Sequence, residues 1–197
     1  MDIIKEIKEN INESINTKQK ILNNCIIINN IIKAINIIEK CYQNNGKVIL
    51  CGNGGSASDA LHLEGELMGR FKKERKGLAA LTLNSNQATI TAIGNDFSYD
   101  KIFERQIECI GQKNDVFIAI STSGNSKNVL NALKIAKEKK INTIALLGHD
   151  GGLCKEYSDI SIIVDSNNTP RIQESHIMIG HIICELLEKV LEENEKK

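Results

Sequence analysis

Tryptophan is absent from the sequence, and aromatic residues make up only 4% of its 197 residues. No charge of one sign predominates either, because 25 Lys and Arg balance 25 Asp and Glu. A chain without a basic excess has no electrostatic footprint for nucleic-acid phosphates, and scarce aromatics offer no platform for stacked bases. We therefore expect no nucleic-acid partner.

Long apolar runs and the signals for export are also missing. Runs such as 26–28 are short and broken by Asn, whereas a membrane-spanning helix needs roughly 18 or more apolar residues. Residues 1–6 alternate charged and apolar side chains, unlike a signal peptide. The cysteines form no CxxC pair, which favours reduced thiols. The sequence thus predicts a cytoplasmic protein with no membrane partner. Its cysteines are Cys25, Cys41, Cys51, Cys109, Cys154 and Cys184.

The first 44 residues are expected to form one or two amphipathic helices. Isoleucines recur there at helical spacing and again between 28 and 38, and Asn residues predict a break near 22–26. So apolar a stripe is expected to pack on the rest of the chain or on another subunit. We treat residues 1–44 as an N-terminal helical extension. Its first stripe is Ile4, Ile7, Ile11 and Ile15.

From residue 45 to 197 the pattern alternates strands and helices within one unit. Strands are expected at 47–51, 78–83, 116–120, 143–147 and 160–164, and helices at 57–70, 86–93, 99–110, 126–140 and 171–193. Strands separated by helices indicate right-handed crossovers and a parallel sheet covered on both faces. The predicted fold class is therefore a three-layer α/β fold with a five-stranded parallel sheet. Pro170 suits the first turn of the last helix.

Two strand-to-helix loops are candidates for binding an anion. The first strand ends in a glycine-rich loop at Gly52–Asp59, and the third ends in a hydroxyl-rich loop at Ser121–Ser126. Glycines admit a ligand close to the backbone, and helix N-termini favour negative charge. In a sheet of order 2-1-3-4-5 these loops flank the topological switch point, where ligands bind. The alternative is that each loop is an ordinary turn with a serine cap.

Two familiar nucleotide motifs are disfavoured. Gly52, Gly54 and Ala57 fit the dinucleotide fingerprint loosely, but the second strand ends at Leu83–Ser85 without a carboxylate for a ribose. No Gly-Lys-Ser/Thr follows a glycine-rich loop, so the chain has no P-loop. The loops instead suit a phosphate monoester.

Titratable residues gather on two of the expected helices. One polar stripe holds Asp59, His62, Glu66 and Arg70, and its alternative interpretation is a solvated helix face. On the last helix, at ~100° per residue, Gln173 lies about 60° from His176 and about 80° from His181. The two histidines are about 140° apart and do not easily serve one small site together, and the spacing alone leaves the choice between them open. His149 is expected at the surface.

Four motifs, in order and in register, carry a family resemblance. They are CGNGGSASDALHLEGELMGRF, AIGNDFSYDKIFERQ, ISTSGNSKNVLNALKIAKEK and RIQESHIMIGH. Together they resemble the phosphoheptose isomerases of the sugar-isomerase (SIS) domain superfamily. The resemblance implies a flavodoxin-like fold and a homotetramer with active sites between subunits. The implied reaction interconverts sedoheptulose 7-phosphate and D-glycero-D-manno-heptose 7-phosphate, the first step towards ADP- or GDP-heptose for lipopolysaccharide and other surface glycans.

The resemblance also implies roles for individual residues. Glu66 would be the base that moves the C1/C2 proton through an enediol, and His181 its partner acid/base. Zinc, one ion per subunit, would have the ligands His62, Glu66, Gln173 and His181, which favours His181 over His176. The phosphate end would be bound by Ser56, Ser121, Thr122, Ser123 and Ser126. Other substrate contacts would come from Asn53, Gly54, Gly55, Glu66, Arg70, Asn95, Asp96 and Gln173.

Two alternatives share these loops. One is a non-catalytic SIS protein that binds a sugar phosphate and acts through a protein partner, such as a replication-initiation factor. The other is a different sugar-phosphate isomerase or a mutase on the same scaffold. The presence of Glu66, Gln173 and His181 together favours the enzyme over the partner-binding protein.

Overall fold

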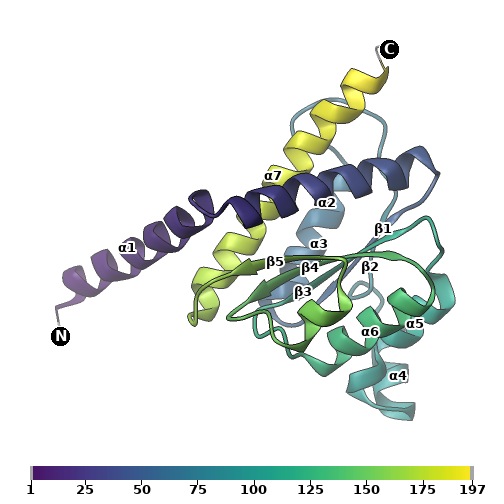
Figure 1. The fold of residues 1–197 in the computed structure, drawn as a ribbon. Coiled ribbons are helices and arrows are strands. Elements are labelled where there is room, and N and C mark those ends of the chain that lie inside the picture. The colour runs from purple at the N-terminus through teal and green to yellow at the C-terminus, as the bar shows by residue number, and fades with distance from the viewer. Residues whose placement is uncertain (1, 196–197) are drawn as a thin grey trace.

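The computed structural model describes residues 2–195 and shows a five-stranded sheet between two helical layers (Figure 1). All strand pairs are parallel, and the strand order is β2-β1-β3-β4-β5, as predicted. The strands are β1 (Val48–Gly52), β2 (Ala80–Thr82), β3 (Val116–Ser121), β4 (Asn142–Gly148) and β5 (Ile160–Val164).

Apolar residues on both faces of the strands explain why the sheet lies in the middle. Every residue of β1 and β3 is buried. Alternate side chains point to opposite faces, so Val48 and Leu50 join one hydrophobic core while Ile49 and Cys51 join the other. Two separate cores, one on each face, hold the three layers together.

The helices divide between the two faces of the sheet (Figure 1). The first core contains side chains of α2 (Cys25–Gln43), α3 (Gly55–Met68) and α7 (Thr169–Glu195). The second contains side chains of α5 (Glu104–Ile110) and α6 (Lys127–Glu138). The remaining elements are α1 (Ile3–Leu22), α4 (Gln87–Asp96) and the 3₁₀ turns η1 (Tyr99–Lys101) and η2 (Leu153–Tyr157).

The break predicted near 22–26 separates α1 from α2. Asn24 caps α2, because its side chain accepts hydrogen bonds from the N–H groups of Ile26 and Ile27. The two helices meet at a 73° bend. Within residues 2–195 no single helix is long and apolar enough to span a membrane, although this bent pair passes the same test of length and composition.

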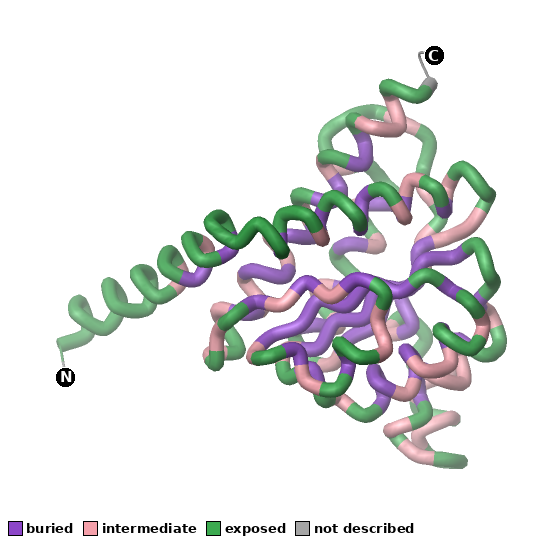
Figure 2. Tube along the Cα trace, in the orientation of Figure 1, coloured by how far each residue is buried: buried purple, intermediate pink, exposed green. Residues whose placement is uncertain are grey.

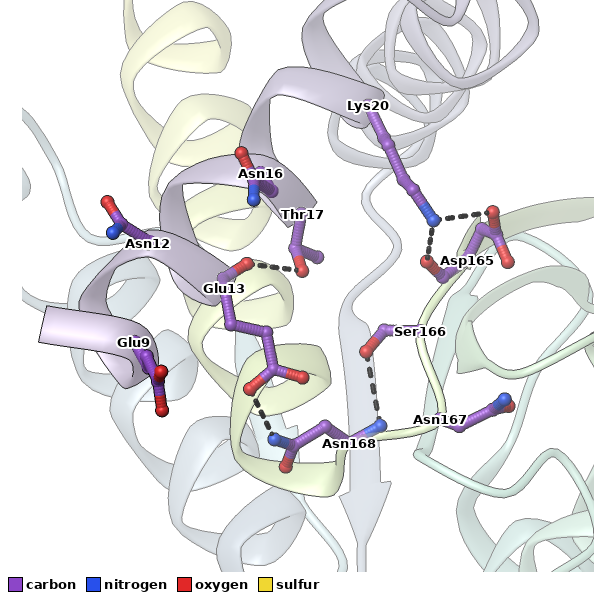
Figure 3. Close-up of a pocket in the computed structure, with 10 residues that line it drawn as sticks. All are labelled: Glu9, Asn12, Glu13, Asn16, Thr17, Lys20, Asp165, Ser166, Asn167 and Asn168. Atoms are coloured by element: carbon purple, nitrogen blue, oxygen red, sulfur yellow. Dashed lines mark hydrogen bonds and ion pairs between the residues drawn. The ribbon is translucent and has the colours of Figure 1, made fainter. Parts of the chain in front are cut away.

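Helix α1 projects from the body of the molecule and is exposed along most of its length (Figure 2). Polar contacts attach its C-terminal half to the β5–α7 connection: Lys20 pairs with Asp165, and Glu13 accepts a hydrogen bond from Asn168 (Figure 3). These residues line a hollow of about 660 Å³, none of whose lining residues belongs to the predicted site. The predicted stripe of α2 packs into the core only in part: Ile31, Ile35 and Ile38 are buried, whereas Ile28 and Ile32 are exposed. The predicted stripe of α1 remains exposed.

Some predicted helix boundaries were wrong. The single helix expected at 99–110 is the turn η1 followed by the short helix α5, because Ile102 and Phe103 between them turn into the second core. Helix α3 ends at Met68, so Arg70 lies beyond it. Helix α7 begins at Thr169, which places Pro170 inside its first turn.

Candidate active site

The two predicted anion loops lie side by side at the carboxyl edge of the sheet. Strands β1 and β3 are neighbours, and Gly52 at the end of β1 is in register with Ile120 in β3. The chain leaves β1 towards β2 on one side and leaves β3 towards β4 on the other. The loops therefore flank the switch point of the sheet, where open α/β sheets bind ligands.

The first loop brings backbone N–H groups to the start of α3. Gly54 has a φ of 56°, a conformation that side chains disfavour, and no side chain caps the helix there. Gly55 lies directly beneath the amide of Gln173, where a Cβ atom would clash with it. Ser56 is buried at the first turn of α3. The absence of a side-chain cap leaves this helix N-terminus suited to an anion.

Asn53 joins the first loop to α6. Its Nδ2 donates to Asn128 Oδ1 at 2.8 Å, while its Oδ1 accepts from Asn128 Nδ2 at 3.0 Å and from the Tyr99 hydroxyl at 2.9 Å. Asn128 is buried. Neither Asn128 nor Tyr99 was predicted from the sequence. The signal for Asn128 was a polar residue on the otherwise apolar inner face of α6.

The second loop presents hydroxyls at the start of α6. Ser121 Oγ donates to Ser126 Oγ at 3.0 Å, and Ser123 Oγ accepts a hydrogen bond from the Asn125 N–H. Ser121 is buried, Thr122 is half-buried and Ser123 is exposed. Ser126 precedes the helix without capping it through its side chain. Hydroxyls and a helix N-terminus thus converge without a lysine or arginine among the loop residues.

A second constellation lies further along α3 and α7. The Nε2 atom of His62 is 3.1 Å from Glu66 Oε1 and 2.9 Å from His181 Nε2. His62 and Glu66 are one helical turn apart, and parallel packing of α7 beside α3 brings His181 to them. Phe71 lies against the His181 ring at 5.4 Å between centroids. We call His62, Glu66 and His181 the His–Glu–His group.

The His–Glu–His group fits a zinc ion. One ligand atom from each residue lies within 4.8 Å of the others. Imidazole nitrogen and carboxylate oxygen are zinc ligands, and tetrahedral zinc with Zn–N near 2 Å holds its ligand atoms roughly 3.3 Å apart. The distances of 2.9 and 3.1 Å are close to that separation.

The structure separates the two histidines of α7. His176 is buried, its Nε2 contacts the Leu147 carbonyl at 3.0 Å, and its Nδ1 has no hydrogen-bond partner within residues 2–195. Burial lowers the pKa of His176 to about 4. His181 instead joins the His–Glu–His group. Gln173 lies about 12 Å along α7 from His181, with its amide over Gly55 rather than in the group.

Asp59 lies one turn before His62 on the same stripe of α3. Its Oδ2 is buried and has no hydrogen-bond partner in the described part of the chain. Burial raises the pKa of Asp59 to about 6, and His62 opposes that rise. A carboxylate so poised beside His62 adds negative potential to this end of the site.

The other predicted substrate contacts lie at the surface. Asn95 and Asp96 are exposed at the end of α4, where Asn95 donates to Asp96 at 2.9 Å. Arg70 is exposed just after α3. Within residues 2–195 no hydrogen bond or ion pair joins these three residues to the loops or to the His–Glu–His group.

The loops and the His–Glu–His group are well separated within one chain. His62 and Glu66 follow Gly55 by seven and eleven residues, which places them about 10 and 16 Å along the axis of α3. An extended seven-carbon sugar phosphate spans roughly 10 Å from C1 to phosphorus by standard bond lengths. Along the axis of α3, the backbone of Glu66 is therefore farther from Gly55 than the length of such a molecule.

The chain is similar to known proteins over most of its length. The SIS domain family matches residues 2–148. The phosphoheptose isomerase of Sulfurimonas denitrificans is 50% identical over 185 residues, which cover 94% of this chain and 95% of that one. The solved phosphoheptose isomerase of Neisseria gonorrhoeae superposes with a TM-score of 0.89 at 37% identity, covering 95% of this chain and 99% of that one. That of Francisella tularensis superposes with a TM-score of 0.92 at 34% identity, covering 96% and 100%.

Proposed function

The chain belongs to the phosphoheptose isomerases of the SIS domain family, and we propose that it interconverts sedoheptulose 7-phosphate and D-glycero-D-manno-heptose 7-phosphate. We place the reaction in the cytoplasm, as the first step towards activated heptose for lipopolysaccharide or other surface glycans. The observation that carries the proposal is the convergence of Glu66 with two imidazoles on a scaffold whose switch point has two anion loops.

The phosphate end of the sugar is assigned to the two loops. Hydroxyls of Ser56 and of the second loop, together with N–H groups at the starts of α3 and α6, donate to phosphate oxygens. Ser121 and Ser126, whose hydroxyls already lie 3.0 Å apart, form the centre of this cradle. Asn53, with Gly54 and Gly55, is assigned to the adjoining sugar hydroxyls.

The proton transfer is assigned to Glu66. Its carboxylate takes the proton from C1 of the ketose, and the electrons of the C–H bond form the C1–C2 double bond of the enediol while the C2 oxygen gains a proton. Return of the proton to C2 forms the aldose as the C1 oxygen loses one. His181 contacts His62, which in turn contacts Glu66. We assign His181 to proton transfer at these oxygens and to ring opening.

Zinc is proposed as the resident metal. His62, Glu66 and His181 would hold it. Gln173 lies too far along α7 to join them within one chain, so it is retained as a substrate contact or as a fourth ligand supplied by another subunit. When bound, zinc supplies Lewis-acid polarisation of a carbonyl oxygen.

A homotetramer with shared active sites is proposed on two observations. The isoleucines of α1 are exposed although apolar: Ile7, Ile11 and Ile15 each show more than half of their surface. A projecting helix with such a stripe fits a second copy of the chain. In addition, the axial separation of about 16 Å between the backbone of Gly55 and that of Glu66 favours a substrate held by the loops of one subunit and contacted by the Glu66 of another.

Proton NMR of the purified protein with sedoheptulose 7-phosphate tests the proposed function. We expect the aldoheptose phosphate to form, and Glu66→Gln to slow its formation by roughly 10²–10⁴-fold, the usual effect of losing a positioned base. Glu64→Gln, two residues away on the same helix, is the matched control and should retain activity. Binding of the sugar phosphate by a folded protein without any turnover would contradict the proposal and favour the partner-binding alternative.

A further inference from the structure

The connection between α3 and β2, residues 69–79, lies across the C-terminal half of α7 (Figure 1). One buried carboxylate holds it there. Glu188 accepts the N–H groups of Phe71, Lys72 and Lys73 at 2.9, 3.0 and 3.1 Å. It also accepts Arg75 Nε at 2.9 Å. With four hydrogen-bond donors on one carboxylate, Glu188 anchors this connection to α7.

Arg75 ties the same carboxylate to the end of α3. Its Nη2 donates to the Glu66 carbonyl and its Nη1 to the Leu67 carbonyl, each at 2.9 Å. These carbonyls lie in the last turn of α3, where intrahelical partners are missing. Arg75 thereby acts as a C-terminal cap supplied from outside the helix.

The ion pair between Arg75 and Glu188 is largely buried, unlike a salt bridge at the surface. The side chains of Arg75 and Glu188 are only 14% and 2% exposed. Burial would raise the pKa of Glu188, but the three backbone N–H groups and Arg75 outweigh it, so the pKa lies below its ordinary value and the carboxylate stays charged. The neighbouring pair Lys72–Glu185 is more exposed, at 60% and 31%, and such pairs contribute little.

Contacts link each residue of the pair to a different part of the His–Glu–His group. The Arg75 end fixes the turn of α3 that carries Glu66. The Glu188 end fixes the backbone of Phe71, whose ring lies against the imidazole of His181. Glu188 itself is two turns beyond His181 on α7.

We propose that Arg75 and Glu188 are positioning residues for the isomerase reaction, which hold Glu66 and the His181 ring in their mutual arrangement without touching substrate. The expected effect on turnover rests on the proposed function. Because the phosphate loops lie at the other end of α3, loss of the pair should affect turnover rather than substrate binding.

Glu188→Gln and Arg75→Lys test the proposal. The matched control is Glu192→Gln, because Glu192 pairs with Lys73 of the same connection from about three turns beyond His181 on α7. Lysine keeps the charge but cannot reach Glu188 and two carbonyls at once, because it lacks the planar fork. In folded variants we expect kcat to fall about 10- to 100-fold, the usual effect of removing a group that orients site residues, while KM changes less than about twofold. An unchanged kcat, or an equal fall in Glu192→Gln, would overturn the proposal.

A second measurement does not depend on activity. The chain has four histidines, so their ring protons are readily assigned by NMR. The His181 resonances should move in Glu188→Gln and stay in place in Glu192→Gln, and an unmoved His181 would overturn the proposal even in a protein that turns nothing over. Wild-type protein without turnover would contradict the proposed function instead. Phe71→Leu, which keeps the ion pair, provides the same kcat and NMR tests if both charge variants fail to fold.

Discussion

The Nε2 atoms of His62 and His181 face each other at 2.9 Å, although 119 positions separate the two residues in the chain. Two neutral imidazoles in this arrangement form a single N–H···N hydrogen bond, whereas a cation between them binds the lone pairs of both Nε2 atoms. The contact, with Glu66 at 3.1 Å from His62, is the geometric centre of the candidate site.

Removal of one imidazole should weaken zinc binding at this group. His62→Gln deletes the ligand atom that contacts both other members, and we expect zinc affinity measured by isothermal titration to fall at least about tenfold. The added zinc should also raise the melting temperature of the wild type but not of the variant. His149→Asn is the control, since Asn tolerates the φ of 54° at that position. Equal zinc binding by His62→Gln and wild type would refute the assignment.

Loss of a loop hydroxyl should weaken substrate binding more than turnover. Ser121→Ala removes a hydroxyl that we assign to the phosphate, and a hydrogen bond to a charged group contributes about 1.5–3 kcal/mol. KM should therefore rise roughly 10- to 100-fold with kcat nearly constant. Ser161→Ala in β5, whose hydroxyl contacts Ser158, is the control. A fall in kcat at constant KM would place Ser121 in the chemistry instead.

Shared active sites make a distinctive prediction for mixtures. Glu66→Gln and Ser121→Ala subunits, unfolded and refolded together, should form some sites that draw an intact Glu66 and an intact loop from different subunits. Turnover at low substrate should then exceed the sum of the two separate variants. If each site lies within one chain, the mixture would show only that sum, and the proposal of sharing would fail.

His176 should make the protein less stable in acid. Its pKa of about 4 lies below the ordinary 6.5, so between these pH values the unfolded chain binds more protons than the folded one. The stabilisation is complete above pH 6.5 and is lost as pH falls towards 4; the shift corresponds to about 3 kcal/mol. Asp59, with its pKa raised to about 6, opposes this trend over part of the same range.

The variant His176→Gln separates the two contributions. It removes one titrating group and leaves Asp59 in place. Chemical denaturation at several pH values should show a smaller loss of unfolding free energy between pH 6.5 and 4 in the variant than in the wild type. Parallel pH profiles for the two proteins would show that His176 does not titrate as its burial indicates.

Local sequence pattern was sufficient for much of the fold. Short apolar runs between helical segments predicted all five strands, because buried parallel strands are apolar on both faces. The local pattern was wrong at 99–110. Helical periodicity continued there through Ile102 and Phe103, although the chain turns at these residues into the second core. Periodicity reports which side chains are apolar, and it does not report where the backbone changes direction.

The sequence by itself determined the strand-to-helix alternation, the two loops at the switch point and the family, because each depends on residues close together in the chain. Between the two histidines of α7, the family resemblance favoured His181, and the tertiary structure places His181 beside His62 and Glu66. Helical spacing alone did not distinguish His176 from His181. The parallel packing of α7 on α3 places His181 in the group and His176 against the Leu147 carbonyl. The contacts of Arg75 with Glu188, 113 positions away, likewise have no local signal. Such pairs arise when helices distant in sequence bury a common face, so their partners are specified by packing rather than by pattern.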